Sequence, residues 1–414
     1  MPKAVNFNIL TEFFTLKKLD FIRLYGYIKP NRCFLENKKG VFSTMSDDKI
    51  DNTHDISKLD PYMAIPVADE EGIKYHSPFE EPIRLAGNPF QKALGHTFRR
   101  IPPGTFISES VDVLSWYTAG IQLQFKSTSR KVMIKATLKH GELMHHMPQT
   151  GSSGFDLYVG GPGNWQLKRS SRFDLHAKEF TTSLFEHEKP GLREYLINFP
   201  LYNGVESVWI GLEEDAEILP PTPWSCDKPV VVYGTSITQG GCASHPGGAW
   251  TNILSRWHNA EFYNFGFSGS GKGEPAAAEM LASIENPRCF ILDYEANAHN
   301  EGIRATLEKF LDILRSKHPE VPITIISKAP HASTMLAFGA DDIACEVAED
   351  CRLSQEFQRE VVAKRRADGD ENLYFIDGLK LLTIDWGECM MDGCHFNDLG
   401  FYRFAENLNK YIKL

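Results

Sequence analysis

The sequence lacks the patterns that mark metal-binding, membrane-spanning and nucleic-acid-binding proteins. Its eight cysteines form no CxxC pair and no Cys/His zinc spacing, so reduced thiols and no bound metal are expected. No apolar run approaches the roughly 18 residues that a membrane span needs. Acidic residues outnumber basic residues by 54 to 44, which gives a formal net charge of −10 without any long basic run. We therefore expect no nucleic-acid partner and no membrane partner.

A recognisable secretion signal is also missing. Residues 1–44 mix apolar and basic side chains but contain no continuous apolar segment that ends at a small-residue cleavage site. We therefore expect a cytoplasmic protein. From Met45 the sequence becomes strongly polar, and residues 1–58 are predicted to form a flexible extension without an identifiable function.

The sequence does contain enough apolar residues for two folded cores. It has 414 residues, of which 42% are hydrophobic and 24% are charged, as in ordinary soluble globular proteins. One core rarely organises so long a chain, so two domains of about 150 to 200 residues are expected. The proline-rich segment at 220–223 cannot extend a helix or a strand and marks their boundary. The predicted domains span residues 59–224 and 225–414.

The first domain is predicted to be a β-sandwich. Between residues 60 and 220, apolar residues recur at every second position within short segments, which is typical of half-buried strands. Short strands separated by turns favour two packed antiparallel sheets. The alternating sets are Ile121, Leu123 and Phe125, then Val132, Ile134 and Leu138, then Val208, Ile210 and Leu212.

The second domain shows apolar strands that alternate with amphipathic helices. This alternation predicts a parallel sheet covered by helices on both faces. Ligands bind such sheets at the carboxyl ends of the strands, so catalytic residues are expected in the loops that follow them. Helical periods are clear at 250–257 and 303–314, and the predicted strands lie at 229–233, 262–265, 289–293, 323–327 and 373–376.

Residues suited to nucleophilic catalysis follow three of these strands. Ser236 comes soon after the first strand, where Gly234 allows a tight turn, although a serine there is also a common helix N-cap. Gly269 follows the second strand and offers either an N–H group or only a flexible turn. Asn297 follows the third strand, where its amide either donates into the same cleft or forms a turn.

A fourth candidate segment lies near the C-terminus, where Asp392 precedes His395 by three residues. This spacing allows the carboxylate to hydrogen-bond the imidazole, although the chain has 14 histidines and a lone histidine is more often structural. Any one of the four segments is a weak signal. Together they fall at one predicted edge of one sheet, in the order Ser, Gly, Asn, then Asp and His.

The segments GTSITQGG, NFGFSGSG, LDYEANA and DGCHFNDLGF together resemble the four sequence blocks of the SGNH (GDSL-like) hydrolases. Residues 154–158 also resemble the GxDLY signature of an N-terminal domain in one bacterial esterase subgroup, so the likeness covers about residues 58–414. It implies a three-layer α/β/α flavodoxin-like domain with a parallel sheet, preceded by a jelly-roll-like β-sandwich. Two departures are Thr235, where most GDSL-type enzymes have Asp, and Phe396, where proline is more usual.

The resemblance also implies roles for these residues in a carboxylic ester hydrolase. Ser236 would attack the ester carbonyl, His395 would accept the serine proton, and Asp392 would orient the imidazole. The Ser236 and Gly269 N–H groups and the Asn297 side chain would form the oxyanion hole. No cofactor is implied. With an unperturbed histidine, activity is expected to rise between about pH 6 and 7.

The substrate is expected to be an ester of a small molecule or an oligosaccharide. The resemblance favours short acyl chains, such as acetyl groups on carbohydrates, with acyl-thioester or lipid hydrolysis as the alternative. Thr235, which precedes Ser236, is a candidate for the substrate pocket. Met147 and Thr150 are further candidates, because the segment 145–154, rich in glycine and hydroxyl groups, would close over Ser236. A plain exposed hairpin loop explains that segment equally well. The sequence leaves the oligomeric state open.

Three other interpretations explain less of the chain. A P-loop at 266–272 lacks the Ser or Thr that would bind Mg²⁺, because residue 273 is glycine. A metal site at His140, His145 and His146 lacks acidic ligands at a fixed period. A non-catalytic carbohydrate-binding protein with a degenerate hydrolase domain would not need an intact catalytic set.

Overall fold

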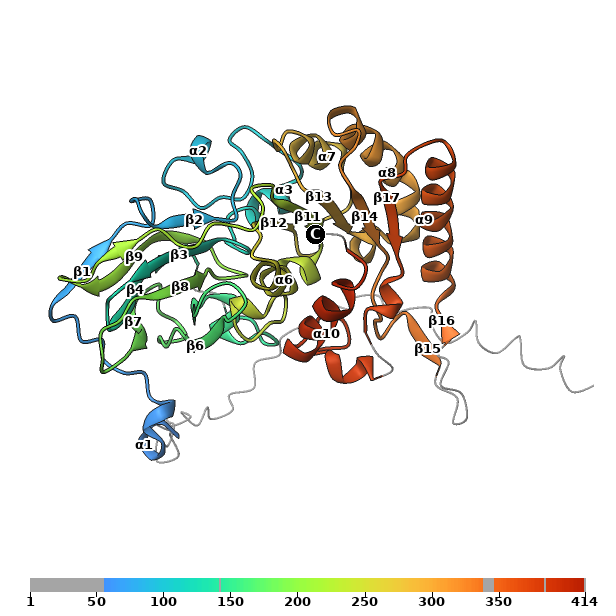
Figure 1. The fold of residues 1–414 in the computed structure, drawn as a ribbon. Coiled ribbons are helices and arrows are strands. Elements are labelled where there is room, and N and C mark those ends of the chain that lie inside the picture. The colour runs from blue at the N-terminus through green and yellow to red at the C-terminus, as the bar shows by residue number, and fades with distance from the viewer. Residues whose placement is uncertain (1–55, 141–142, 338–345, 383–384, 413–414) are drawn as a thin grey trace, which may run out of the picture. The chain divides into compact units, whose positions relative to one another are not determined.

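The computed structural model describes residues 56–140, 143–337, 346–382 and 385–412. The extension predicted at 1–58 lies almost wholly outside the described residues. Among the described residues, the short helix α1 (Ile56–Leu59) belongs to one unit, and Asp60–Leu414 form a second, compact unit. In this second unit, antiparallel sheets are followed along the chain by one parallel sheet (Figure 1). No helix within the described residues combines the length and the apolar character of a membrane span.

The two antiparallel sheets that precede the parallel sheet along the chain form the β-sandwich that the alternating pattern predicted. Leu123, Phe125, Ile134 and Ile210 belong to one fully buried apolar cluster between them, because alternate residues of each strand face inward. The first sheet has the order β1 (Ile73–His76), β9 (Val205–Glu213), β4 (Lys131–Leu138), β7 (Glu179–Glu186). The second has the order β10 (Ile218–Leu219), β3 (Gln122–Ser127), β8 (Arg193–Asn198), β5 (Asp156–Val159), β6 (Gln166–Ser170), with β2 (Arg84–Ala86) also paired to β3.

Five parallel strands form the other large sheet, in the spatial order second, first, third, fourth, fifth along the chain. This flavodoxin-like order reverses beside the first strand, and ligands bind at the carboxyl ends next to that reversal. The predicted parallel sheet is therefore confirmed. Its strands in spatial order are β12 (Phe262–Gly266), β11 (Val230–Gly234), β13 (Cys289–Asp293), β14 (Ile323–Ile326) and β17 (Leu373–Ile376).

Helices connect these strands, and two of them have residues at their ends that stabilise a helix terminus. Asn397 caps the last helix by accepting a hydrogen bond from the Gly400 N–H (3.0 Å). The longest helix begins with Glu295 and ends near Arg315 and Lys317, charges that complement its dipole. The long helices are α6 (Trp250–His258), α7 (Pro275–Ala282), α8 (Glu295–Lys317), α9 (Glu349–Ala367) and α10 (Asp398–Leu408).

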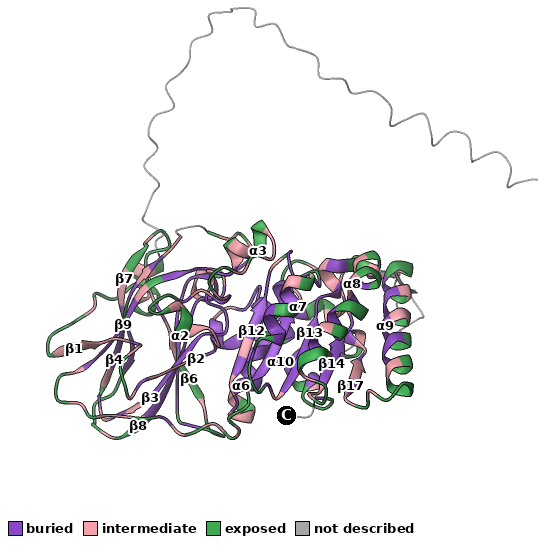
Figure 2. Cartoon of the chain, turned by 90° about the horizontal axis from the view of Figure 1, so that it is seen from above, coloured by how far each residue is buried: buried purple, intermediate pink, exposed green. Residues whose placement is uncertain are grey.

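Alternate residues of the central strands pack against helices on opposite faces of the sheet. Val231 and Tyr233 of β11 share an apolar cluster with α7, α8 and α9, whereas Val230 and Val232 share another with α6 and α10. Figure 2 shows β12, β13 and β14 as buried strands among helices that expose part of their surface. The sheet is thus covered on both faces, as its continuous apolar strands require.

The sandwich and the parallel sheet share one of these cores. Met147 and Leu201, from the sandwich half of the chain, are buried in the same cluster as Trp250 and Phe401 of α6 and α10. Contacts of this kind join the two halves within the unit Asp60–Leu414. The predicted boundary between residues 224 and 225 therefore lies inside one compact body.

Two segments expected to be loops are helical instead. Asn297 lies in the first turn of α8, because the chain turns directly from β13 into that helix. Within the segment 145–154, Gln149–Ser152 form the short helix α4. The remaining short elements are η2 (Pro61–Met63), α2 (Gln91–Leu94), α3 (Glu109–Leu114), α5 (Ser236–Gln239), η3 (Pro246–Gly248), β15 (Met335–Ala337), β16 (Glu346–Val347), η4 (Gly378–Lys380) and η5 (Trp386–Cys389).

Candidate active site

The loops after β11 and β12 meet tightly at the carboxyl edge of the parallel sheet. A Cβ atom at Gly271 would lie 2.1 Å from the carbonyl oxygen of Gly234, and one at Gly234 would lie 2.2 Å from Thr238 Oγ1. Both distances are too short for any side chain, so only glycine permits this approach. The two loops thereby reach the same point at the strand order reversal, where ligands of such sheets bind.

Ser236 is the first residue of α5, directly after β11. Its Oγ lies 3.0 Å from His395 Nε2. Thr235, not Ser236, occupies the N-cap position, and no side chain caps this helix. Ser236 is therefore not the N-cap residue of α5, and its hydroxyl does not cap this helix. As the first helical residue, Ser236 also has an N–H group without an intrahelical acceptor.

Asp392 and His395 lie in the turn between η5 and α10. Asp392 Oδ2 is 2.8 Å from His395 Nδ1, and Oδ1 accepts hydrogen bonds from the N–H groups of Cys394 (2.9 Å) and His395 (2.7 Å). With Nδ1 bound to the carboxylate, the protonated nitrogen of a neutral His395 is Nδ1. Nε2 then has a free lone pair directed at Ser236. The structure thus brings the three predicted catalytic residues into one hydrogen-bonded chain.

The charges around this chain shift the pKa values of its members. The neighbouring Cys394 thiolate and the Asp392 carboxylate raise the pKa of His395 to about 9, although partial burial opposes this. Burial opposes ionisation of Asp392, but hydrogen bonds from the backbone and ring of His395 lower its pKa to about 2. Burial likewise opposes ionisation of Cys394, yet hydrogen bonds from His331 and His395 lower its pKa to about 6.

The predicted oxyanion donors lie at the ends of β12 and β13. The N–H groups of Ser270 and Gly271 face the Asn297 side chain, so its amide oxygen is oriented toward them at 3.0 and 3.3 Å. The Asn297 NH₂ group is then directed to the opposite side. Gly269 adopts φ +67°, a left-handed conformation that suits glycine, and is exposed.

A cavity of about 140 Å³ opens beside Ser236. Thr235 is nearly fully buried and its Oγ1 has no hydrogen-bond partner among the described residues. His299 adopts φ +54° inside α8 and produces a kink there, a backbone strain often found at functional sites. The lining residues are Thr235, Ser236, Ile237, Asp293, Ala296, Asn297, His299, Lys328, Ala329, Pro330, His331, Ser333, Cys394 and Phe396.

The three predicted pocket residues occupy different places. Thr235 lines the cavity, as does Phe396, the residue that departs from the family pattern. Met147 is buried in the shared core, and the Thr150 hydroxyl donates to the Ser244 carbonyl at 2.6 Å. Neither Met147 nor Thr150 lines this cavity. Their segment packs against the chain after α5 rather than standing exposed, because a Cβ at Gly151 would lie 2.0 Å from the Ala243 carbonyl oxygen.

Several residues around the site were not predicted. The loop 328–333 supplies five lining residues and directly follows the predicted strand at 323–327, so the strand-end rule alone points to it. Arg100 has no comparable signal: its fully buried guanidinium donates to the carbonyls of Asn264 (2.8 Å) and Gly266 (2.9 Å) at the end of β12. Such long-range contacts have no sequence period.

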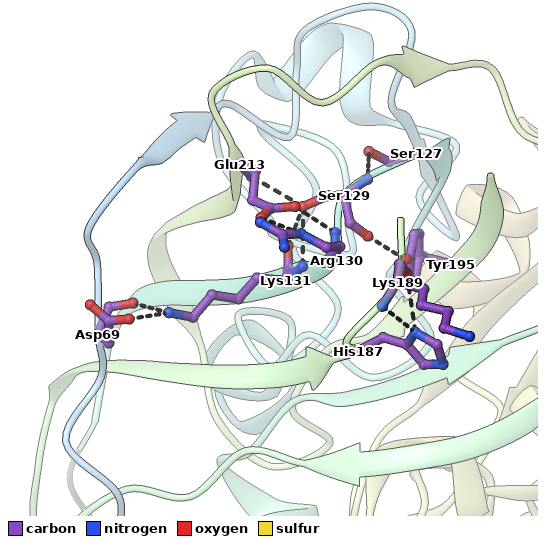
Figure 3. A network of polar contacts seen from close by, with 9 residues as sticks. All are labelled: Asp69, Ser127, Ser129, Arg130, Lys131, His187, Lys189, Tyr195 and Glu213. Atoms are coloured by element: carbon purple, nitrogen blue, oxygen red, sulfur yellow. Dashed lines mark hydrogen bonds and ion pairs between the residues drawn. The ribbon is translucent and has the colours of Figure 1, made fainter. Parts of the chain in front are cut away.

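A larger depression of about 510 Å³ lies on the sandwich, lined by charged residues such as Asp69, Arg130 and Lys131. Both basic residues of this lining are paired with acidic ones. Arg130 forms a two-pronged bond to Glu213, and Lys131 Nζ lies 2.9 Å from Asp69 Oδ2 (Figure 3). The ion pair between Arg130 and Glu213 joins the start of β4 to the end of β9, which is a structural role. Unlike the smaller cavity, this depression contains no nucleophile next to a base.

Comparisons with known proteins agree with this geometry. The model of the GDSL-like lipase/acylhydrolase family matches residues 227–413, and that of the GxDLY N-terminus of SGNH-hydrolase-type esterases matches residues 73–218. A Bacteroides ovatus protein described as a GDSL-like lipase is 30% identical, with a TM-score of 0.72, over 82% of this chain and 96% of its own. No curated protein matches.

Two further solved structures share the fold at lower identity. A salicylyl-acyltransferase from a tetracycline biosynthetic pathway has a TM-score of 0.64 and 19% identity, over 83% of this chain and 97% of its own. A family two carbohydrate esterase from Cellvibrio japonicus has a TM-score of 0.51 and 12% identity, over 82% of this chain and 96% of its own.

A flavodoxin-like domain joined to a β-sandwich, with serine, histidine and aspartate gathered at one sheet edge, is the architecture of an acylhydrolase. The chain belongs to the GDSL-like lipase/acylhydrolase family, also called the SGNH hydrolases, and is a carboxylic ester hydrolase. The resemblance drawn from its four sequence blocks is confirmed.

Proposed function

We propose that this hydrolase removes short acyl groups, with acetyl esters of carbohydrates as its substrate class, through an acyl-enzyme on Ser236. The observation behind the proposal is the hydrogen-bonded chain from Asp392 through His395 to Ser236, which ends at the cavity of about 140 Å³. A serine hydroxyl needs such a neighbouring base to become nucleophilic at neutral pH. The proposed activity follows from the nucleophile and base together with the limited space beside them.

In the proposed mechanism, Ser236 Oγ attacks the ester carbonyl while His395 Nε2 takes its proton. Asp392 stabilises the imidazolium cation and keeps its ring in place. The N–H groups of Ser236 and Gly269 and the NH₂ group of Asn297 donate to the carbonyl oxygen as it becomes negative. His395 returns the proton to the leaving alcohol. Water then attacks the acyl-enzyme with the same base, which releases the acid and restores Ser236.

The cavity limits the size of the acyl group. At about 140 Å³, the cavity beside Ser236 is small. A small cavity favours a short acyl chain over a long one. The lining includes Lys328, His331 and Ser333, whose polar groups suit an alcohol rich in hydroxyls. Both features favour a short acyl group on a polar alcohol over a long-chain lipid.

The test compares hydrolysis of p-nitrophenyl esters from acetyl to decanoyl and of an acetylated xylo-oligosaccharide. We expect the highest kcat/KM for the acetyl ester, a steep fall with chain length, and release of acetate from the oligosaccharide. Ser236→Ala should lower kcat/KM by about 10⁴-fold or more, while the thermal unfolding midpoint changes little. A fluorophosphonate probe should label the wild type and spare this variant.

Other outcomes separate the alternatives. A preference for decanoyl esters or for acyl-thioesters would replace the proposed substrate class. Faster consumption of ester when a second alcohol is added, with a new ester as product, would indicate acyl transfer, the reaction named for the salicylyl-acyltransferase of this fold. Retained activity in Ser236→Ala would remove Ser236 as the nucleophile.

A further inference from the structure

The structure brings two further side chains with nitrogen or sulfur ligand atoms close to the proposed base, His395. One ligand atom each of His146, Cys242 and His395 lies within 4.8 Å of the other two. His146 comes from the sandwich half of the chain, Cys242 follows α5, and His395 precedes α10. The three are distant in sequence and meet only in the fold, where the ring centroids of His146 and His395 are 5.6 Å apart.

A second observation distinguishes this cluster from ordinary packing. His146 Nδ1 is buried and has no hydrogen-bond partner among the described residues. A buried ring nitrogen without a partner is unfavourable, because it has lost its hydrogen bonds to water and gained none in return. A cation bound through Nδ1 would satisfy this nitrogen. Thiolate and imidazole are the ligands that zinc prefers, whereas magnesium and calcium require oxygen.

The distances suit zinc after small movements. Three atoms no more than 4.8 Å apart always leave a point within about 2.8 Å of each. Zinc bonds are about 2.0 Å to nitrogen and 2.3 Å to sulfur, so each ligand atom needs to move by less than about 1 Å. Side-chain rotation provides such movement without a change of fold.

We propose that His146, Cys242 and His395 form a zinc site whose occupation switches the hydrolase off. Binding releases the proton of the Cys242 thiol to solvent and uses the lone pair of His395 Nε2. That lone pair is the one that accepts the Ser236 proton, so metal and catalysis compete for it. The inhibitory part therefore rests on the proposed function. The site is inhibitory and not catalytic, in keeping with the expectation that the reaction needs no metal.

Activity assays on the full-length protein test the switch. Each variant is titrated with Zn²⁺ alone and compared with its own rate in EDTA, using p-nitrophenyl acetate. We expect micromolar Zn²⁺ to inhibit the wild type and EDTA to restore it. In His146→Ala and Cys242→Ala, the half-inhibiting Zn²⁺ concentration should rise at least about tenfold, since even an outer-shell partner contributes that much.

Two matched controls identify the ligands. His145 neighbours His146, with ring centroids 4.4 Å apart, but is exposed and outside the cluster, so His145→Ala should keep the wild-type inhibition. Cys394 belongs to a rival group with Asp392 and His395. Retained inhibition in Cys394→Ala supports the proposed site. Loss of inhibition in Cys394→Ala, with His146→Ala unchanged, would overturn it in favour of that group.

A direct binding measurement separates this proposal from the proposed function. Co²⁺ added to Ser236→Ala should give a thiolate-to-cobalt charge-transfer band that disappears in the double variant with Cys242→Ala. This readout requires no activity, so it holds even if Ser236 is not the nucleophile. The absence of the band would overturn the site. A band in the wild type together with full activity would overturn the switch.

Discussion

The carboxylate of Asp392 acts on His395 in two ways at the scale of single residues. One oxygen binds the ring at Nδ1, and the other binds two backbone N–H groups of the same turn. The carboxylate is therefore held rigidly while it holds the imidazole. Ser236 lies at the other ring nitrogen, 3.0 Å away. Position, more than the intrinsic chemistry of serine, is what makes this hydroxyl a candidate nucleophile.

The charges next to His395 change the expected pH profile. The proposed base must be neutral, and the Cys394 thiolate and the Asp392 carboxylate raise the pKa of His395 from its ordinary value to about 9. A raised pKa keeps the base protonated to higher pH. Activity should therefore still be rising well above pH 7, toward about pH 9, instead of levelling off by about pH 7 as an unperturbed histidine would.

Removal of the cysteine tests this cause. Cys394→Ala deletes the anion nearest to His395 Nε2, so the pKa of His395 should fall and the rising limb of kcat/KM should move to lower pH. Cys226→Ala removes another free cysteine of intermediate exposure and serves as the control. In this variant, the rising limb of kcat/KM should stay at the same pH as in the wild type. The measurement is kcat/KM for p-nitrophenyl acetate across the pH range. A limb that stays in place in Cys394→Ala would contradict the assigned cause.

At the scale of elements, Arg100 connects the sandwich half of the chain to the end of β12. Its guanidinium donates to carbonyls at the end of β12, and also to the Leu114 (2.9 Å) and Tyr117 (2.6 Å) carbonyls. It also lies 4.9 Å from the ring centroid of Phe267, two residues before Gly269, the proposed oxyanion donor. Because Gly269 follows Phe267 so closely, Arg100 is placed to position Gly269 without contacting the substrate.

Replacement of Arg100 should therefore affect turnover more than binding. Arg100→Met should lower kcat by about 10- to 100-fold with a small change in KM, since a misplacement of about 1 Å near a reacting centre can cost 10²-fold. Arg99→Met is the control, because Arg99 pairs with Asp112 and Ser115, away from β12. If Arg100→Met does not fold, Arg100→Lys and its kcat serve instead. A rise in KM with an unchanged kcat would show that Arg100 has no positioning role.

At the scale of the whole molecule, Asp156 joins the sandwich to the chain after α5. This fully buried carboxylate accepts hydrogen bonds from Asn198 Nδ2 (2.6 Å) and the Gly247 N–H (2.5 Å), and lies 2.7 Å from His245 Nδ1. Burial opposes protonation of His245, but the Asp156 carboxylate raises its pKa. The aspartate of the GxDLY segment is therefore a link between the two halves of the chain.

Asp156→Asn should lower the free energy of unfolding by about 3 kcal/mol, because it leaves buried donors without their anion. A histidine whose pKa is raised in the folded state stabilises the fold fully below its unfolded value of about 6.5. That contribution is lost as pH rises through the folded-state pKa. The difference between wild type and variant, measured by chemical denaturation, should thus be larger at mildly acidic than at alkaline pH. Asp174→Asn, an exposed control, should show neither effect.

The shared core predicts that the hydrolase half is not independent. Met147, Leu201 and Ala119 are buried against residues of α6 and α10, so residues 225–414 alone would expose apolar surface. We expect this fragment to be aggregation-prone and to lose most esterase activity. Expression of the fragment, followed by gel filtration and an ester panel, checks this. A soluble fragment with the kinetic constants and chain-length preference of the whole protein would contradict any pocket role for the sandwich.

The strands and motif segments that were predicted correctly are those with a signal in neighbouring residues of the sequence. Each strand of the parallel sheet was predicted because a run of apolar residues between turns is recognisable within a few positions. The segments with Ser236 and His395 were recognisable in the same way. Asn297 was assigned to a loop, because its neighbours show no strong helical period before residue 303. In the structure it lies in helix α8. Met147 was predicted to line the pocket because its segment, 145–154, is rich in glycine and hydroxyl groups. In the structure it is buried in the core.

The sequence by itself determined the two kinds of sheet, the family and the residues proposed for catalysis, because periodicity and motifs are properties of neighbouring positions. Only the tertiary structure decided which distant residues meet. Arg100 reaches Gly266 across 166 positions, and Asp156 reaches Gly247 across 91. The gathering of His146 with Cys242 and His395 has the same origin. Such contacts depend on how the sandwich packs against the parallel sheet, and that packing is set by the shape of whole surfaces, which no local pattern encodes.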